Sequence, residues 1–257
     1  PLGGVFTNAA GGQVDLGSNI TISPTFRIDN AGHIFVRRGT LNLTGGGTGG
    51  GTYEVLSPAT MRTLNASFDN GAVLLGDGTI EFPTYYQEHG RTTFSGNVTL
   101  AGSNMQMGPI VNGSGANLGV YVAGTATITG TFNWTGGYIS GGAQGNLVIG
   151  PTGTMNVLPD PNGGFNHEHV LRVNTRNEND VLLRAGTTTD DLFLNAAFTN
   201  NSQFIFDAQQ NLDVHVRQAV AGGTATFLNT TTGVIRKIGA GTGTFDDAHT
   251  VDTHMVP

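Results

Sequence analysis

The sequence contains no cysteine and little charge. Without cysteine no disulfide can stabilise the fold, and thiols say nothing about the redox compartment. Charged residues make up 11% of the chain, less than half of the roughly 25% that is usual. Lys and Glu, which cover the exposed faces of many helices, are therefore scarce, so the sequence offers little from which to build helices.

Two further absences exclude classes of partner. The formal net charge is −7, and the only basic pairs are Arg37-Arg38 and Arg236-Lys237. Nucleic acids require a basic face, so we expect no nucleic-acid partner. No apolar run approaches the ~20 residues of a transmembrane helix, so we also expect no membrane span. The chain begins at Pro1 without an initiator Met, and we interpret it as a processed chain or a fragment.

Glycine, Thr and Asn are abundant, and they separate short alternating segments. The chain has 41 Gly among 257 residues, about 16% against an average near 7%. Hydrophobic residues still reach 37%, which favours a folded chain over a disordered one. Alternating apolar and polar residues indicate strands with one buried face. In the stretch 124–157 this pattern predicts strands at 125–128, 131–134, 138–140, 146–149 and 154–157.

An Asn-centred motif recurs along the chain, which indicates a repeat architecture. Each copy has an apolar residue, a spacer, Asn, a short turn and then a β-branched or aromatic residue; the asparagines are Asn8, Asn30, Asn70, Asn200 and Asn229. Asn tolerates the left-handed backbone of a sharp corner, and its amide can bond to neighbouring turns as a ladder. The motif spacings predict one coil per about 20–30 residues. We therefore predict an all-β fold, a parallel β-helix with short strands, Gly and Asn corners and a few protruding loops.

We expect one solenoid domain over residues 1–257. The Gly-rich run 45–52 is interpreted as a corner, because the strand pattern resumes directly after it. The strongest break is the loop 159–169, which would separate the sub-blocks 1–158 and 170–245. A polar tail follows at 246–257.

Several segments carry a resemblance to known proteins. The run from Phe132 to Gly141 (FNWTGGYISG) is similar to the W-T-G-G-x-[IM]-S-G runs of large bacterial surface proteins. The run from Gly39 to Gly47 (GTLNLTGGG) and the late F-x-N-x-[ST] segments, with Val234–Lys237, look like repeats of the same group. The chain thus resembles autotransporter-like and filamentous-haemagglutinin-like proteins. The resemblance implies a right-handed parallel β-helix, export, and a role in adhesion or in an extracellular scaffold, and it supplies no catalytic signature.

One loop is the best candidate for an exposed contact surface. Tyr85, Tyr86 and His89 lie in the predicted loop 83–92. Aromatic rings can stack on sugars, whereas Trp134 and Tyr138 lie in alternating strands and are expected in the core. We therefore assign a speculative glycan contact to Tyr85, Tyr86 and His89.

Two clusters have metal-binding side chains. His167 and His169 are two apart and would share a strand face, and Asp246 and Asp247 lie near two tail histidines. A transition metal would suit the histidines and Ca²⁺ the carboxylates. Neither cluster has the spacing of a known motif, so we favour a solvated loop for the first and a frayed or docking tail for the second. We expect no cofactor, with Ca²⁺ as the alternative.

Carboxylates raise the question of an enzyme, because many β-helices cleave polysaccharides. The candidates are Asp180, Asp190, Asp191, Asp207 and Asp213. A glycosidase needs two carboxyl groups about 5–10 Å apart across a cleft. Asp190 and Asp191 are adjacent, so in a strand they would point to opposite faces. We expect no enzyme, with a polysaccharide lyase, a glycoside hydrolase or a phage tailspike fragment as the minor alternative.

The stacked architecture favours a structural function. Open ends of a solenoid offer unpaired strand edges, which recruit other strands. We expect a secreted or cell-surface protein that self-assembles head to tail into a filament, or that continues into neighbouring repeats of a longer chain. The alternative is an adhesin module that binds glycans through the loops 83–92 and 159–169. Smooth Thr and Asn faces would favour the structural function, and an acidic groove would favour an enzyme. Thr rows could also suit ice, but the chain has no strict T-x-T repeat.

Overall fold

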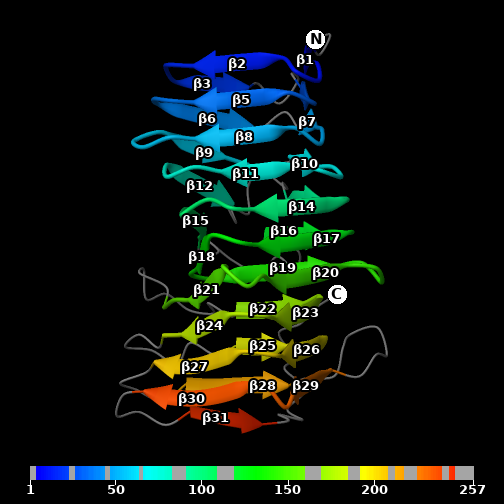
Figure 1. The fold of residues 1–257 in the computed structure, drawn as a ribbon, viewed down its shortest axis with the longest axis vertical. Coiled ribbons are helices and arrows are strands. Elements are labelled where there is room, and N and C mark those ends of the chain that lie inside the picture. The colour runs from blue at the N-terminus through cyan, green and yellow to red at the C-terminus, as the bar shows by residue number, and fades with distance from the viewer. Residues whose placement is uncertain are drawn as a thin grey trace.

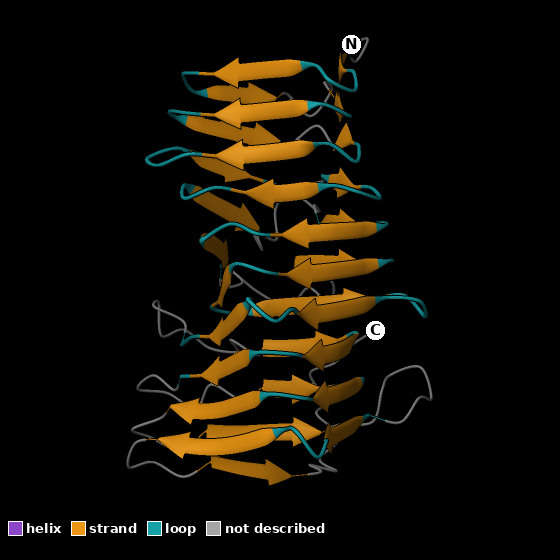
Figure 2. Cartoon of the chain, in the orientation of Figure 1, coloured by secondary structure: helices purple, strands orange, loops and turns teal. Residues whose placement is uncertain are grey.

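The structure is an all-β solenoid (Figures 1 and 2). The computed structural model describes residues 4–22, 27–43, 47–63, 66–82, 91–108, 119–159, 169–184, 192–207, 212–216, 225–238 and 243–246. Every element in these ranges is a strand of two to five residues, and neighbouring strands within each sheet are parallel. The predicted parallel β-helix is confirmed.

Two ten-stranded sheets run the length of the molecule. Sheet 1 contains, in pairing order, β2 (Gln13–Leu16), β5 (His33–Val36), β8 (Thr52–Val55), β11 (Val73–Leu75), β14 (Asn97–Leu100), β17 (Thr125–Ile128), β20 (Asn146–Ile149), β23 (Asn174–Asn177), β26 (Ala197–Asn200) and β29 (Thr226–Asn229). Sheet 2 contains β3 (Ile20–Ile22), β6 (Thr40–Leu43), β9 (Thr60–Arg62), β12 (Thr79–Phe82), β15 (Asn104–Met107), β18 (Thr131–Trp134), β21 (Thr154–Val157), β24 (Asp180–Leu183), β27 (Gln203–Asp207) and β30 (Val234–Ile238).

The third face is built from an eight-stranded and a three-stranded sheet. Sheet 3 contains β10 (Ser67–Phe68), β13 (Thr92–Phe94), β16 (Gly119–Val122), β19 (Gly137–Gly141), β22 (His169–Arg172), β25 (Leu192–Leu194), β28 (Leu212–Val216) and β31 (Gly243–Asp246). Sheet 4 contains β1 (Val5–Asn8), β4 (Arg27–Asn30) and β7 (Gly47–Thr48), and β7 lies beside β10. Partners within each sheet are three strands apart in the chain, because each coil visits three faces before it returns.

The coil is right-handed. In Figure 1 the near strands β2, β5 and β8 point left, β3 and β6 behind them point right, and the chain descends from the N-terminus. This is the hand that right-twisted parallel strands adopt in their crossover connections.

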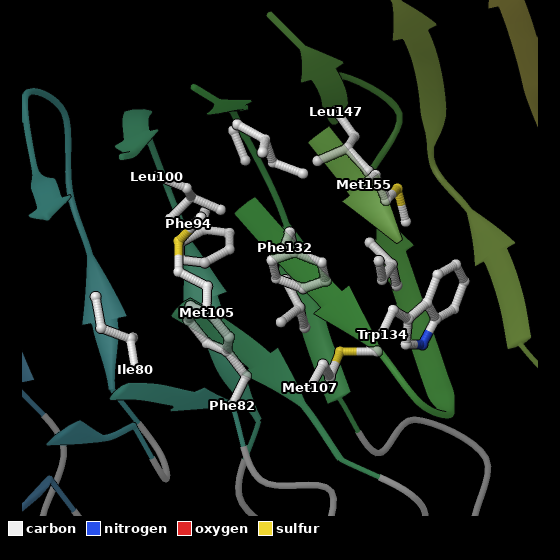
Figure 3. Packing of buried hydrophobic residues seen from close by; sticks show 14 of the residues in the cluster. Ile80, Phe82, Phe94, Leu100, Met105, Met107, Phe132, Trp134, Leu147 and Met155 are labelled. Atoms are coloured by element: carbon white, nitrogen blue, oxygen red, sulfur yellow. The ribbon is translucent and has the colours of Figure 1, made fainter. Parts of the chain in front are cut away.

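Alternate side chains of each strand fill the interior. In β12, for example, Ile80 and Phe82 are buried, whereas Thr79 and Glu81 face outward. The parallel register stacks like positions, so Ile80 lies over Met105 and Phe132, as Figure 3 shows. Full burial of one such side chain contributes about 1.5–3 kcal/mol relative to exposure. The core is therefore a continuous column in which each coil contacts its neighbours.

The strands predicted within 124–157 are confirmed. β17, β18, β20 and β21 have the predicted bounds, and β19 extends the predicted 138–140 by one residue at each end. Two residues that we expected in loops instead lie in strands, since Thr92 begins β13 and His169 begins β22. Both side chains are buried. Sheets 1 and 2 continue past the loop 159–169, because β20 pairs with β23 and β21 with β24.

Candidate functional site

The recurring asparagines lie at two different corners of the solenoid. Asn8 and Asn30 are buried where the third face turns into sheet 1. Asn8 Nδ2 donates to Asn30 Oδ1 at 2.8 Å, and Asn30 Nδ2 donates to the Thr52 carbonyl at 3.0 Å. The amides therefore satisfy groups of the next coil, as a ladder requires.

A second ladder lies where sheet 1 turns into sheet 2. Asn177 Nδ2 donates to Asn200 Oδ1, and Asn200 Nδ2 donates to Asn229 Oδ1, both at 2.7 Å. Sequence reasoning missed Asn177, because Thr175 stands where the motif has an apolar residue. Asn70 is exposed at the first corner and accepts from the Asn97 backbone N–H at 3.2 Å. The five predicted asparagines therefore do not form one column.

The predicted metal ligands do not assemble in the part of the chain that is described. His169 is fully buried, and its Nε2 lies 3.2 Å from the Trp134 carbonyl. The centroids of the His169 and Trp134 rings are 5.1 Å apart, and the two rings pack edge to face. His169 is thus a core residue, whereas a surface site shared with His167 would need it to face outward. His167 and Asp247 lie outside the described residues, and Asp246 ends β31 with its side chain not described. No group of three metal-ligating side chains gathers among the described residues.

The other predicted site residues can be placed only in part. Tyr85, Tyr86 and His89 lie outside the described residues, as do Asp190 and Asp191, and the Asp213 side chain is not described. Asp180 begins β24 opposite Gln203, whereas Asp207 ends β27 and lies 3.5 Å from Arg184 Nε. Four residue steps separate these carboxylates along the strands, about 13 Å, which exceeds the spacing that a glycosidase needs.

The remaining described carboxylates form mainly surface ion pairs. Arg37 Nε lies 2.7 Å from Asp15, Arg62 Nε lies 2.5 Å from Glu81, and Arg176 Nε lies 2.6 Å from Glu178. Each pair is substantially exposed, so each contributes at most about 1 kcal/mol. Their geometry is that of a solvated surface.

Two described side chains have displaced pKa values, and neither is suited to acid–base chemistry. Burial by itself would raise the pKa of Asp29, but hydrogen bonds from Arg27 at 2.8 Å and Thr48 at 2.9 Å, with the Arg27 charge, hold it below the ordinary value of 3.8. Burial raises the pKa of Tyr53 far above its ordinary range. Asp29 therefore stays ionised and Tyr53 stays neutral at physiological pH.

The outer face of sheet 2 carries two parallel columns of polar side chains. The register aligns the first column as Thr40, Thr60, Thr79, Asn104, Thr131 and Thr154, and the second as Asn42, Arg62, Glu81, Gln106, Asn133 and Asn156. Hydrogen bonds link successive coils, as from Asn104 Nδ2 to Thr79 Oγ1 at 3.0 Å and from Asn156 Nδ2 to Asn133 Oδ1 at 2.8 Å. Sequence reasoning missed these columns, because the coils differ in length and the residues are unevenly spaced. The face presents a regular array of hydroxyl and amide groups.

The two ends of the solenoid carry all the strongly exposed large apolar residues of the described chain. These are Val5 and Phe6 at the N-terminal end, and Leu228, Val234, Ile235, Ile238 and Phe245 at the C-terminal end, with 38–56% of their surface exposed. Phe245 packs on Phe227 with ring centroids 4.8 Å apart. The end strands β29, β30 and β31 each pair with one described strand, as do β1, β2 and β3. Among the described residues, each end therefore combines strands that are paired on one side only with exposed apolar surface.

Comparison of the chain with models of protein families, with curated proteins and with solved structures gives no match. Among the described residues, no helix has the length and apolar character needed to cross a membrane.

Proposed function

We propose that this chain is a structural segment of an extracellular fibre or matrix, and that its copies associate end to end through the open edges of the solenoid. The observation that carries the proposal is that exposed large apolar residues concentrate at the two ends. Strand edges recruit further strands, and apolar contact adds to the backbone hydrogen bonds.

The magnitudes fit a specific but moderate association. Burying the exposed portions of the inward-facing end residues Phe6, Ile235 and Phe245 would contribute on the order of 2–4 kcal/mol. Association costs about 4–15 kcal/mol in lost freedom of motion, so backbone hydrogen bonds along the new strand pairs must supply the remainder. We expect association that depends on concentration.

Secretion and a surface location belong to the same proposal. The resemblance to autotransporter-like and filamentous-haemagglutinin-like repeats supports it, and so do the Thr and Asn columns on sheet 2. A face of this kind, with few charges, suits a rod that is exposed to solvent along its whole length.

Sedimentation velocity over a wide range of concentration, with negative-stain electron microscopy, tests the proposal. The wild-type chain should form rods longer than one molecule. Ile235→Asp places a charge at the C-terminal end, where Ile235 is 45% exposed, and should yield monomers. Val148→Asp adds the same charge on the outer face of sheet 1 midway along the rod and should assemble like wild type. Circular dichroism must show that both variants fold. Wild-type monomers at the highest concentration would refute the proposal.

The polar face of sheet 2 supports a second candidate function, an adhesin module that binds glycans. Hydroxyl and amide groups repeated along a flat strand surface can bond to successive sugars. Glycan-array binding by the wild type should be lost in Asn133→Ala/Asn156→Ala and retained in Thr127→Ala, which changes the outer face of sheet 1. Equal loss of binding in both variants, or no glycan binding by the wild type, would argue against this face as the binding surface.

A further inference from the structure

We infer that the end-to-end junction is offset by one face, so that β29 of one copy pairs with β1 of the next, β30 with β2, and β31 with β3. This inference rests on the proposed end-to-end association and specifies its register. The simple alternative would continue sheet 1 onto sheet 1 and pair β29 with β2. Three independent features of the two end coils favour the offset junction.

The first feature is that the two end corners match in sequence and in geometry. Residues 226–238 (TFLNTTTGVIRKI) align without a gap with residues 5–17 (VFTNAAGGQVDLG), which places Phe227 on Phe6 and Asn229 on Asn8. Both corners have the same internal hydrogen bond, from Gly233 N–H to the Thr230 carbonyl at 3.0 Å and from Gly12 N–H to the Ala9 carbonyl at 2.8 Å. Two coils whose corners have the same shape can stack in parallel.

The second feature is the direction of the asparagine ladders. In both ladders Nδ2 of one Asn donates to Oδ1 of the Asn in the following coil. At the C-terminal end, Asn229 Nδ2 bonds only to the Gly233 carbonyl of its own corner, at 3.0 Å. At the N-terminal end, Asn8 Oδ1 accepts no hydrogen bond from any described residue. The offset junction places this donor beside this acceptor and joins the two ladders, whereas the alternative places Asn229 against Val14 or Leu16.

The third feature is that side-chain character matches along the second strand pair. Ile235 would lie on Val14, both on the interior side of their strands, because Ile235 is opposite Phe204 and Val14 is opposite Ile34. Arg236 would face Asp15 on the outer side, where the Asp15 side chain is 57% exposed. Apolar contact inside and opposite charges outside are both favourable in a strand pair.

Lys237 is the mismatch in this junction. It is opposite Phe206, on the interior side of β30, and would meet Leu16 of the next copy. A lysine stem can lie along apolar surface while its ammonium group reaches water, but the fit would be better with an apolar side chain. The offset junction therefore predicts that Lys237→Met strengthens association.

Cysteine cross-linking tests the register directly, because the chain has no cysteine of its own. The offset junction places Leu228 opposite Thr7, and both are exposed on the outer side of their strands. The alternative places Leu228 opposite Gln13 or Asp15. The experiment compares the Thr7→Cys/Leu228→Cys chain with Gln13→Cys/Leu228→Cys and Asp15→Cys/Leu228→Cys under mild oxidation, on non-reducing gels. The two cysteines of each chain lie at opposite ends of the rod, so a disulfide must join two molecules.

Each outcome decides between the proposals. A ladder of covalent oligomers from the Thr7/Leu228 chain alone is expected for the offset junction. A ladder from either control chain alone would overturn the offset and leave end-to-end association standing. If no chain forms a ladder while sedimentation detects oligomers, association is lateral and the offset is wrong. If no chain forms a ladder and all sediment as monomers, the proposed function fails together with the inference.

Discussion

Removing the central amide of the second ladder should destabilise the solenoid far more than removing an exposed one. Asn200 is fully buried between Asn177 and Asn229, whereas Asn70 is exposed at the first corner. The substitutions Asn200→Ala and Asn70→Ala remove the same atoms from the same motif. They therefore separate the effect of the ladder from the effect of Asn at a corner.

The expected magnitude follows from the lost hydrogen bonds. Asn200→Ala removes the bonds to Asn177 and Asn229, both 2.7 Å long, and each contributes about 0.5–1.5 kcal/mol. Asn177 Nδ2 keeps its hydrogen bond to the Gln203 carbonyl at 2.9 Å, and the side chain of Asn229 can bond to water because it is exposed. The substitution therefore leaves neither side chain with the full desolvation cost of a buried polar group that has no partner. We expect a loss of about 2–3 kcal/mol. Asn70→Ala loses one bond of 3.2 Å at the surface and should cost less than about 1 kcal/mol.

Urea unfolding followed by circular dichroism measures both values. The midpoint for Asn200→Ala should fall well below that of the wild type, and the midpoint for Asn70→Ala should stay close to it. Equal small losses in the two variants would show that the buried ladder contributes no more than a solvated amide, which would contradict this prediction.

Three further predictions concern a corner, the core and pH. Gly12→Ala should lower the unfolding midpoint, because its Cβ would overlap Asn8 Oδ1, whereas Gly17→Ala should be neutral, since no atom lies within 4 Å of its Cβ. Trp134→Ala should cost about 3–5 kcal/mol in urea unfolding, since Trp134 is fully buried and donates to the Gly136 carbonyl at 3.0 Å. The pKa of Asp29 is lowered in the fold, so its carboxylate stabilises the fold above the ordinary value of 3.8, and this stabilisation is lost as the pH falls through the lowered pKa. The melting temperature of Asp29→Asn should therefore fall less steeply with acid than that of the wild type.

The architecture could be predicted from the sequence because strand alternation and turn residues are local signals. β17, β18, β20 and β21 follow from a period of two and from the Gly and Pro between them. The phase of each coil is not a local signal. All three faces have the same alternation of apolar and polar residues, so the sequence does not show at which corner Asn8 or Asn200 lies. Only the pairing of distant strands determines the corner.

The same lack of a local signal explains why the burial of His169 and the polar columns on sheet 2 could not be predicted. His169, Val170 and Leu171 are all buried, so alternation does not apply there, and the surface position expected for His169 was wrong. The columns on sheet 2 need the register of strands that are separated by coils of unequal length, as between Thr79, Asn104 and Thr131. The exposed apolar residues at the ends could not be predicted for another reason. Ile235 has the sequence pattern of a core residue, and its exposure depends on whether a further coil packs on it.

The parallel stacking described above gives the rod a particular response to tension. The hydrogen bonds between coils run along the long axis, so a pull on the two ends opens the bonds of one coil at a time instead of shearing many together. Each coil that peels away releases its stored length; a coil of 22 residues, as from Asn8 to Asn30, extends to about 70 Å. A fibre made of such rods would lengthen in steps at nearly constant force, and would yield gradually under load before the chain itself is strained.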